Sequence, residues 1–189
     1  MNISYDQNAI RVIDHLVSAA VCQQVIDLYQ RDHRRHRLDG DRYIELDIFG
    51  ASKDWRSQPF IAEWNQLIPE VLTPISQALA DYQQRWDPLA MMPARGAMEG
   101  VRIKSYQPLQ HEFRLHVDQG DRGSSRRYLA CLLYLEDNSA GTEFPLESLT
   151  VDCQQGRMVL FPPTWQYPHR GLMPTASTKY IVSTYWVYT

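Results

Sequence analysis

The spacing of apolar residues divides the chain into two halves. In the first half, apolar residues recur every three or four positions, as they do on the buried face of an α-helix. One such run follows Ser18, a residue type that caps helix N-termini, and a longer one covers Pro59–Trp86. Pro69 and Pro74 lie inside the longer run, and we expect them to kink or divide that helix. The first half is therefore predicted to be mainly helical.

Beyond residue 100 the helical period is replaced by short alternating runs separated by turn residues. Asp87–Gly100 is predicted to be a linker or loop. The pattern predicts strands at Ala9–Ile13, Tyr43–Phe49, Val101–Tyr106, Phe113–Asp118, Arg127–Glu136, Glu147–Asp152, Met158–Phe161 and Lys179–Tyr188. Many short strands at this spacing are typical of a sandwich or jelly roll, and the helices are expected to pack on one sheet face.

A length of 189 residues fits a single domain. Within that domain we expect residues 1–97 to form a helical support region with the first strands, and residues 98–189 to form the β core that carries the functional site.

Composition and charge exclude several classes of protein. A hydrophobic content of 44% with 22% charged residues is typical of a globular chain. The net charge of −3 gives no basic footprint for nucleic acid, and no apolar run is long enough to cross a membrane. The basic run Arg31–Arg37 is either a solvated helix end or a rim that attracts an acidic substrate. Cys22, Cys131 and Cys153 are widely spaced, which favours buried thiols in the cytoplasm.

Three side chains suggest a metal site. On a strand, His116 and Asp118 point to the same face, which places an imidazole beside a carboxylate. This pair alone is a weak signal. His169 follows a separate apolar strand, and a second imidazole would complete a facial triad of two histidines and one carboxylate, which suits Fe(II) and leaves open positions for other ligands.

Lys179 begins an otherwise apolar and aromatic strand, on the face that it shares with Ile181, Ser183 and Tyr185. A lysine at this position either lies at a solvated strand end or is buried against an anion, because an unpaired buried ammonium group is costly.

In order and spacing, the second half resembles the prolyl-4-hydroxylase-type 2-oxoglutarate/Fe(II)-dependent dioxygenases. The resemblance extends over nearly ninety residues. The matching motifs are Tyr106, His116-Val-Asp118, Tyr134-Leu-Glu136, Gly141-Thr-Glu-Phe144, Gly156-Arg-Met-Val-Leu-Phe161, His169 and Lys179. The resemblance implies a double-stranded β-helix, which is a cupin-like jelly roll.

The resemblance also implies residue roles and cofactors. His116, Asp118 and His169 would bind iron, and Lys179 and Tyr134 would bind the distal carboxylate of the co-substrate 2-oxoglutarate. Tyr106 would line the same pocket, with Ser183 nearby. O₂ would be consumed, ascorbate is an optional reductant, and the reaction would be hydroxylation of an unactivated C–H bond. Candidate substrate contacts are Arg127, Gln119 and Tyr128.

The sequence leaves the substrate and one alternative function open. The segments around Tyr106, Gly141 and His169 depart from the common family pattern in their loops, which affects substrate assignment most. The substrate is expected to be a peptidyl proline, a free amino acid or another small metabolite. A non-catalytic jelly-roll protein that binds a metal or small ligand as a sensor remains the alternative, and a lectin-like module would leave the triad unexplained.

Overall fold

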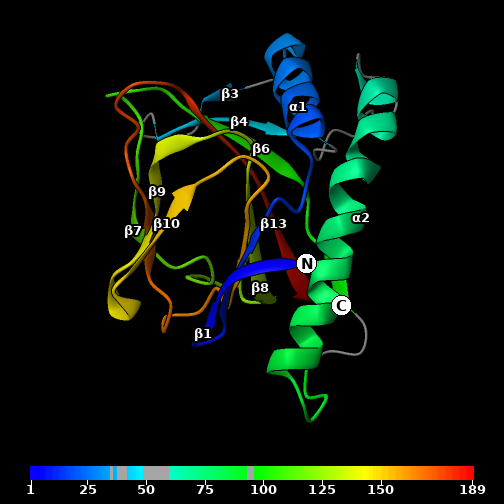
Figure 1. Cartoon of the computed structure of the whole chain (residues 1–189), viewed down its shortest axis with the longest axis vertical. Coiled ribbons are helices and arrows are strands. Elements are labelled where there is room, and N and C mark those ends of the chain that lie inside the picture. Colours follow the sequence, from blue (N-terminus) through cyan, green and yellow to red (C-terminus); the bar gives the residue numbers. More distant parts are fainter. Residues whose placement is uncertain (35, 38–41, 49–59, 93–95) are drawn as a thin grey trace.

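The computed structural model describes residues 1–34, 36–37, 42–48, 60–92 and 96–189, and within these two β-sheets face each other. The larger sheet has nine strands in the order β1-β2-β11-β8-β13-β6-β4-β3, with β5 pairing to β13. The smaller sheet has the order β10-β9-β12-β7. The two sheets and the pairing of strands distant in sequence form the jelly roll (Figure 1).

Thirteen strands, two α-helices and a short 3₁₀ helix make up the described part of the chain. The α-helices are α1 (Ala19–Arg31) and α2 (Ile61–Trp86), and the 3₁₀ helix is Pro145–Glu147. The strands of the larger sheet are β1 (Asn2–Gln7), β2 (Ile10–Asp14), β3 (His36–Arg37), β4 (Ile44–Asp47), β5 (Gly96–Met98), β6 (Arg102–Tyr106), β8 (Arg127–Tyr134), β11 (Met158–Phe161) and β13 (Lys179–Tyr188). Those of the smaller sheet are β7 (Phe113–His116), β9 (Asn138–Phe144), β10 (Leu149–Cys153) and β12 (His169–Gly171).

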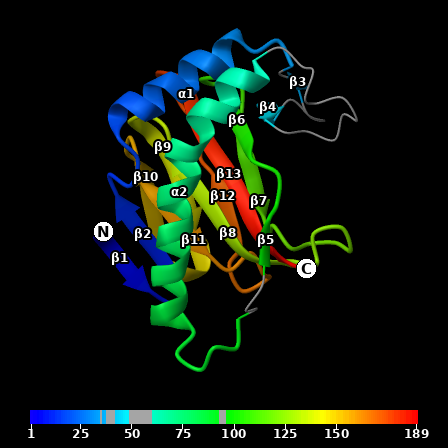
Figure 2. The ribbon, with the colours of Figure 1, turned by 90° about the vertical axis from the view of Figure 1, so that its right-hand side faces the viewer.

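Each face of the larger sheet has its own core. Both α-helices lie across the outer face, as Figure 2 shows. Their apolar residues, among them Trp64 and Val71 of α2, share one core cluster with Leu133 of β8. The inner face packs against the smaller sheet around Phe144 and Phe161. Alternation along β8 supplies both cores, because Leu133 faces the helices while Leu132 faces the second sheet. The larger sheet is therefore buried on both sides, and the inner space between the sheets is available for a site.

Most of the predicted elements are confirmed, and β11 and β13 have the predicted bounds. The mostly β jelly roll with helices on one sheet is also confirmed. Phe49 and Pro59, at which a predicted strand ends and a predicted helix begins, lie outside the described residues.

Several boundaries were wrong. Pro69 and Pro74 do not divide α2, which is one helix; Pro69 follows buried Ile68 and Pro74 precedes buried Ile75, so packing keeps the helix continuous. The expected loop Asp87–Gly100 contains the short strand β5, which pairs with β13.

Strands β1, β3, β9 and β12 were not predicted. They are short, polar or exposed, and it is backbone pairing with neighbours that makes them strands. The basic run divides between the end of α1 and β3, and two of its arginines pair with acids: Arg31 with Glu63, and Arg34 with Asp32.

The Ser18 cap gives a test of the fold. Its Oγ accepts a hydrogen bond from the backbone N–H of Val21 at 3.3 Å, which satisfies one of the free donors of the first helical turn. We expect Ser18→Ala to lower the free energy of unfolding by about 1 kcal/mol, measured by urea denaturation. Ser76→Ala on the exposed side of α2 is the matched control and should not destabilise the protein. Equal effects of the two substitutions would contradict this role for Ser18.

Candidate metal centre

Two antiparallel strands of the smaller sheet bring the two histidines together. In the pairing of β7 with β12, His116 and His169 are direct cross-strand partners, and their ring centroids lie 4.3 Å apart. Asp118 lies two residues beyond His116, just after the end of β7. The side chains of this triad thus come from strand ends that the sheet register fixes against each other.

The three side chains converge on one point. Nε2 of His116 is 3.3 Å from Oδ1 of Asp118, and Nε2 of His169 is 3.4 Å from Oδ2 of the same carboxylate. One ligand atom from each residue lies within 4.8 Å of the other two. Bonds of about 2 Å to a shared cation can span separations of this size.

Unpartnered polar atoms support a cation at this point. Nε2 of His116 and Oδ2 of Asp118 are buried and have no hydrogen-bond partner among the described residues. Each histidine directs its other nitrogen, Nδ1, at a backbone carbonyl two residues earlier: His116 at Arg114 and His169 at Tyr167. A proton on Nδ1 in each ring would leave Nε2 free to bind a metal ion. The donor set of two imidazoles and one carboxylate fits Fe(II).

Neighbouring side chains hold the carboxylate in place. The hydroxyl of Tyr185 donates a 2.9 Å hydrogen bond to Oδ1 of Asp118. Nη1 of Arg127 donates to the backbone carbonyl of Asp118, and its guanidinium lies 3.9 Å from the centre of the Tyr185 ring. Glu99 binds the same guanidinium through both oxygens, at 2.7 and 2.6 Å. Asp118 is therefore fixed by its side chain and by its backbone.

A register shift in the larger sheet explains the position of Arg127. In the pairing of β13 with β8, Trp186 faces Leu129 but Val187 faces Arg127, so β8 has one extra residue, Tyr128, at this point. The bulge directs Arg127 toward Tyr185 and Asp118. Tyr128 packs instead against the helix-side core, with its ring 5.1 Å from that of Tyr188. Tyr128 therefore does not line the pocket, because strict alternation does not hold across the bulge, and its contact with a substrate stays a prediction.

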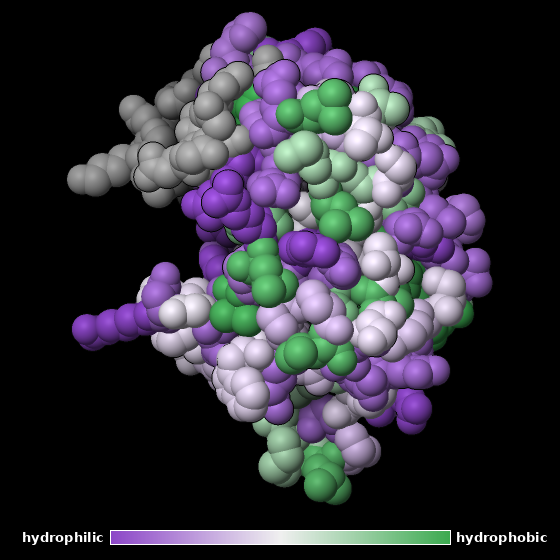
Figure 3. All heavy atoms as spheres, turned by 90° about the vertical axis from the view of Figure 1, so that its left-hand side faces the viewer, coloured by the Kyte–Doolittle hydropathy of each residue, from purple (hydrophilic) through white to green (hydrophobic). Residues whose placement is uncertain are grey.

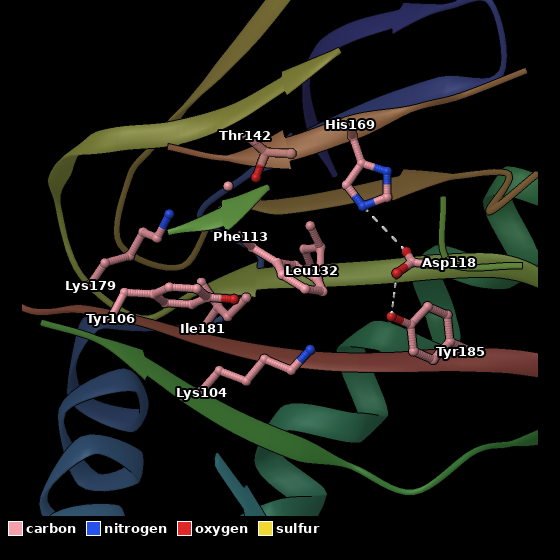
Figure 4. A pocket seen from close by; sticks show the side chains of 11 residues that line it. Lys104, Tyr106, Phe113, Asp118, Leu132, Thr142, His169, Lys179, Ile181 and Tyr185 are labelled. Atoms are coloured by element: carbon pink, nitrogen blue, oxygen red, sulfur yellow. Dashed lines mark hydrogen bonds and ion pairs between the residues drawn. The ribbon is translucent and has the colours of Figure 1, made fainter. Parts of the chain in front are cut away.

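A pocket extends from Asp118 and His169 between the two sheets (Figure 4). Its lining residues are Lys104, Tyr106, Phe113, Asp118, Leu132, Thr142, His169, Gly171, Lys179, Ile181 and Tyr185. Figure 4 shows Lys179 at the opposite end of the pocket from Asp118 and His169. Its side chain is 2% exposed, and Nζ donates to the carbonyl of Leu172 and lies 4.6 Å from the Tyr106 ring centroid.

The other residues expected at the co-substrate pocket have different surroundings. Tyr106 lines it. Tyr134 is buried and donates a 2.8 Å hydrogen bond to Thr142, and it is Thr142 that lines the pocket. Ser183 is fully buried, does not line the pocket, and its Oγ has no partner among the described residues. Gln119 donates to the carbonyls of Ser125 and Arg127, which closes the loop between β7 and β8.

Sequence reasoning did not single out Tyr185, Thr142 or Lys104 as site residues. Two kinds of signal were available: strand alternation for Tyr185 and Lys104, and a sequence motif for Thr142. Tyr185 shares a strand face with Lys179, and Lys104 shares one with Tyr106. Thr142 lies inside the Gly141–Phe144 motif, where its side chain partners Tyr134.

Burial sets the electrostatics of the site. Burial lowers the pKa of His169 to about 4, so the ring is neutral at pH 7 and available as a ligand. Burial would raise the pKa of Asp118, but the two neighbouring imidazoles and Lys104 hold it well below its usual range. Burial also lowers the pKa of Lys179 to about 8, so its ammonium group remains mostly charged at neutral pH. The pocket therefore has two donors at one end, the carboxylate of Asp118 and the neutral imidazole of His169, and a buried ammonium group at the other.

A family comparison agrees with this arrangement. Residues 101–188 match the model of the 2OG-Fe(II) oxygenase superfamily, where 2OG is 2-oxoglutarate. The match confirms the resemblance predicted from the motifs and identifies these residues as a 2OG-Fe(II) oxygenase domain. Members of that superfamily use Fe(II), 2-oxoglutarate and O₂. No curated relative matches the chain by sequence.

Several solved structures with a similar fold are prolyl hydroxylases. A viral collagen prolyl hydroxylase from Paramecium bursaria Chlorella virus-1 matches with a TM-score of 0.70 at 15% identity, covering 97% of this chain and 98% of that one. A Trichoplax adhaerens prolyl hydroxylase, in complex with a hypoxia-inducible-factor peptide fragment, has a TM-score of 0.65 at 16% identity, with coverages of 96% and 84%. A Pseudomonas putida prolyl-4-hydroxylase has a TM-score of 0.64 at 16% identity, with coverages of 97% and 94%. At these identities the likeness concerns the fold.

The hydrogen bond from Tyr185 to Asp118 gives the first test of the site. We expect Tyr185→Phe to lower Fe(II) affinity about 10- to 100-fold under anaerobic conditions, because the carboxylate loses the group that orients it. The affinity can be measured by competition with a chromogenic chelator. Tyr188→Phe, at a half-exposed position, is the matched control. Unchanged affinity in the Tyr185 variant would show that the bond does not position the ligand.

His169 gives a second test, through pH. Its pKa is about 4 in the folded, metal-free chain, against an ordinary value of 6.5. Between these values the unfolded chain binds a proton that the folded chain does not, so the free energy of unfolding falls as the pH falls from about 6.5 to about 4. We expect His169→Gln to reduce this slope, measured by urea denaturation of metal-free protein at several pH values. Identical slopes in the two proteins would contradict the assignment.

Proposed function

We propose that this protein is an Fe(II)- and 2-oxoglutarate-dependent hydroxylase that inserts oxygen into an unactivated C–H bond of a prolyl residue, a free amino acid or another small metabolite. The observation that carries the proposal is that two kinds of group lie at opposite ends of one pocket. A triad suited to Fe(II) lies at one end, and the buried ammonium group of Lys179 lies at the other.

This arrangement fits the charge distribution of 2-oxoglutarate. One carboxylate and the keto oxygen of the co-substrate would bind at the metal end, held by His116, Asp118 and His169. The distal carboxylate would reach Lys179, whose Nζ donates a hydrogen bond to the backbone carbonyl of Leu172. The bound metal and co-substrate would supply the activation of O₂, and succinate and CO₂ would be the co-products. The protein's own part is to bind, orient and exclude water.

Packing around Lys179 supports its role as an anion-binding residue. A β-carbon at Gly171 would lie 3.5 Å from Nζ, so glycine leaves space at the ammonium group. The ring of Tyr106 and the hydroxyl of Thr142 border the same space. Among the described residues Leu172 supplies the single acceptor for Nζ of Lys179, which leaves donors for a ligand carboxylate.

The substrate and surroundings of the enzyme are proposed on separate grounds. The prolyl option is supported by the fold that the chain shares with prolyl hydroxylases, one of which is bound to a peptide. The described helices include none that is long and apolar enough to span a membrane. A cytoplasmic location is proposed from the three free, buried cysteines.

Lys179 provides the test of the function. In the wild type, anaerobic addition of Fe(II) and 2-oxoglutarate should produce the weak visible charge-transfer band of the chelate. We expect Lys179→Met to raise the 2-oxoglutarate concentration for half-saturation of this band about 10- to 100-fold, because the distal carboxylate loses its charged partner. Fe(II) affinity should be unchanged. Succinate release would be followed in parallel.

Arg31→Met is the control for loss of a cation, because this side chain is exposed on α1. A wild-type protein that binds Fe(II) but shows neither the chelate band nor succinate release would contradict the hydroxylase proposal. That result would favour the non-catalytic metal- or ligand-binding alternative.

A further inference from the structure

A second lysine points into the same pocket. Lys104 lies two residues before Tyr106 on β6, so alternation places both on the pocket face. Figure 4 shows its ammonium group directed toward the space between Tyr106 and Tyr185, on the side of the pocket near Asp118. The residue is 6% exposed, so the ammonium group faces the pocket rather than bulk solvent.

Only aromatic rings meet this ammonium group in the described part of the structure. Nζ lies 4.7 Å from the ring centroid of Tyr43 and 5.4 Å from that of Phe113. These cation–π contacts offset part of the cost of removing the charge from water. Among the described residues Lys104 donates no hydrogen bond to protein, so its three N–H donors are unused.

The nearest carboxylates are directed to other groups. Glu45 is the cross-strand partner of Lys104, but its Oε1 approaches Nε of Arg102 at 3.8 Å. Asp118 accepts from Tyr185 and faces the two imidazoles. Neither carboxylate lies within 4.0 Å of Lys104 in an ion pair among the described residues. Burial accordingly lowers the pKa of Lys104.

Two lysines therefore border a pocket in which Asp118 is the only carboxylate among the lining residues. The distal carboxylate of 2-oxoglutarate accounts for Lys179. Figure 4 shows the ammonium group of Lys104 on the side of the pocket nearer Asp118, away from Lys179. A buried ammonium group with free donors at that end is suited to a second carboxylate.

We propose that Lys104 binds a carboxylate beside the metal centre, and that this carboxylate belongs to the primary substrate. The inference rests on the proposed function and narrows it: the substrate is a free amino acid or another small carboxylic acid. A prolyl residue inside a peptide has no carboxylate to offer. The metal-bound end of the keto acid is the second source of the same chemistry, and the experiment separates the two.

The experiment compares free amino acids with their amides in a succinate-release assay, using wild type and Lys104→Met. We expect at least one free acid to stimulate release and its amide to stimulate much less. Lys104→Met should lower kcat/KM for that acid about 10- to 100-fold, and Lys104→Arg should restore part of the loss. The affinity for 2-oxoglutarate, measured from the anaerobic chelate band, should be unchanged in Lys104→Met.

A second arm uses pyruvate, a keto acid without the distal carboxylate. If Lys104→Met weakens the binding of both pyruvate and 2-oxoglutarate, the carboxylate at Lys104 is the metal-bound one of the keto acid, and the assignment to the primary substrate is overturned. Glu45→Gln is the structural control. If Lys104 serves only as a partner of Glu45, both variants should lower thermal stability equally and neither should change carboxylate binding.

Three further results would overturn the proposal. In the first, amides or peptides with an internal proline stimulate succinate release as strongly as free acids. In the second, Lys104→Met has unchanged kinetics and unchanged keto-acid binding. In the third, no free acid in the panel stimulates release while keto-acid binding is unchanged. Failure of the underlying function would look different, since the wild type itself would then show no chelate band.

Discussion

The buried carboxylate of Asp118 between two imidazoles is the constraint on which the site depends. Two of the polar atoms gathered there, Nε2 of His116 and Oδ2 of Asp118, have no hydrogen-bond partner in the described structure. Unpartnered buried polar atoms are destabilising, and a shared cation satisfies them together. The fold maintains the arrangement because His116 and His169 are paired in the register of two antiparallel strands. A slip of one residue would turn one imidazole out of the pocket.

The surrounding sheet fixes the remaining freedom of that carboxylate. Tyr185 on β13 donates a hydrogen bond to the side chain of Asp118, and Arg127 on β8 donates one to its backbone. The larger sheet therefore supports Asp118, which follows a strand of the smaller sheet. The extra residue in β8 makes this support possible, because it turns Arg127 to the pocket side. Glu99 then neutralises and orients the guanidinium. The metal end of the pocket is thus preorganised by contacts between the sheets.

The sequence predicted that the triad would converge and that Lys179 would share its pocket, because strand alternation and motif spacing determine which face a side chain takes. His116, Asp118 and His169 converge, and Lys179 is buried in the same pocket. Local pattern failed where tertiary contacts decide: strict alternation along β8 does not hold at Tyr128, since a bulge is set by pairing rather than by composition. Strands β9 and β12 were also missed, because pairing with their neighbours rather than local composition makes them strands. The roles of Ser183, Tyr134, Arg127 and Gln119 toward ligands, and the division of the chain at residue 97, remain predictions.

The most direct measurement of the central claim is anaerobic titration of the protein with Co(II), a spectroscopic substitute for Fe(II). A site made of His116, Asp118 and His169 with open positions for solvent predicts saturation at one ion per chain, with the weak visible absorption of five- or six-coordinate cobalt. It also predicts loss of this absorption in Asp118→Ala. No saturable binding, or an absorption that is unchanged in that variant, would show that these three side chains do not form the metal site.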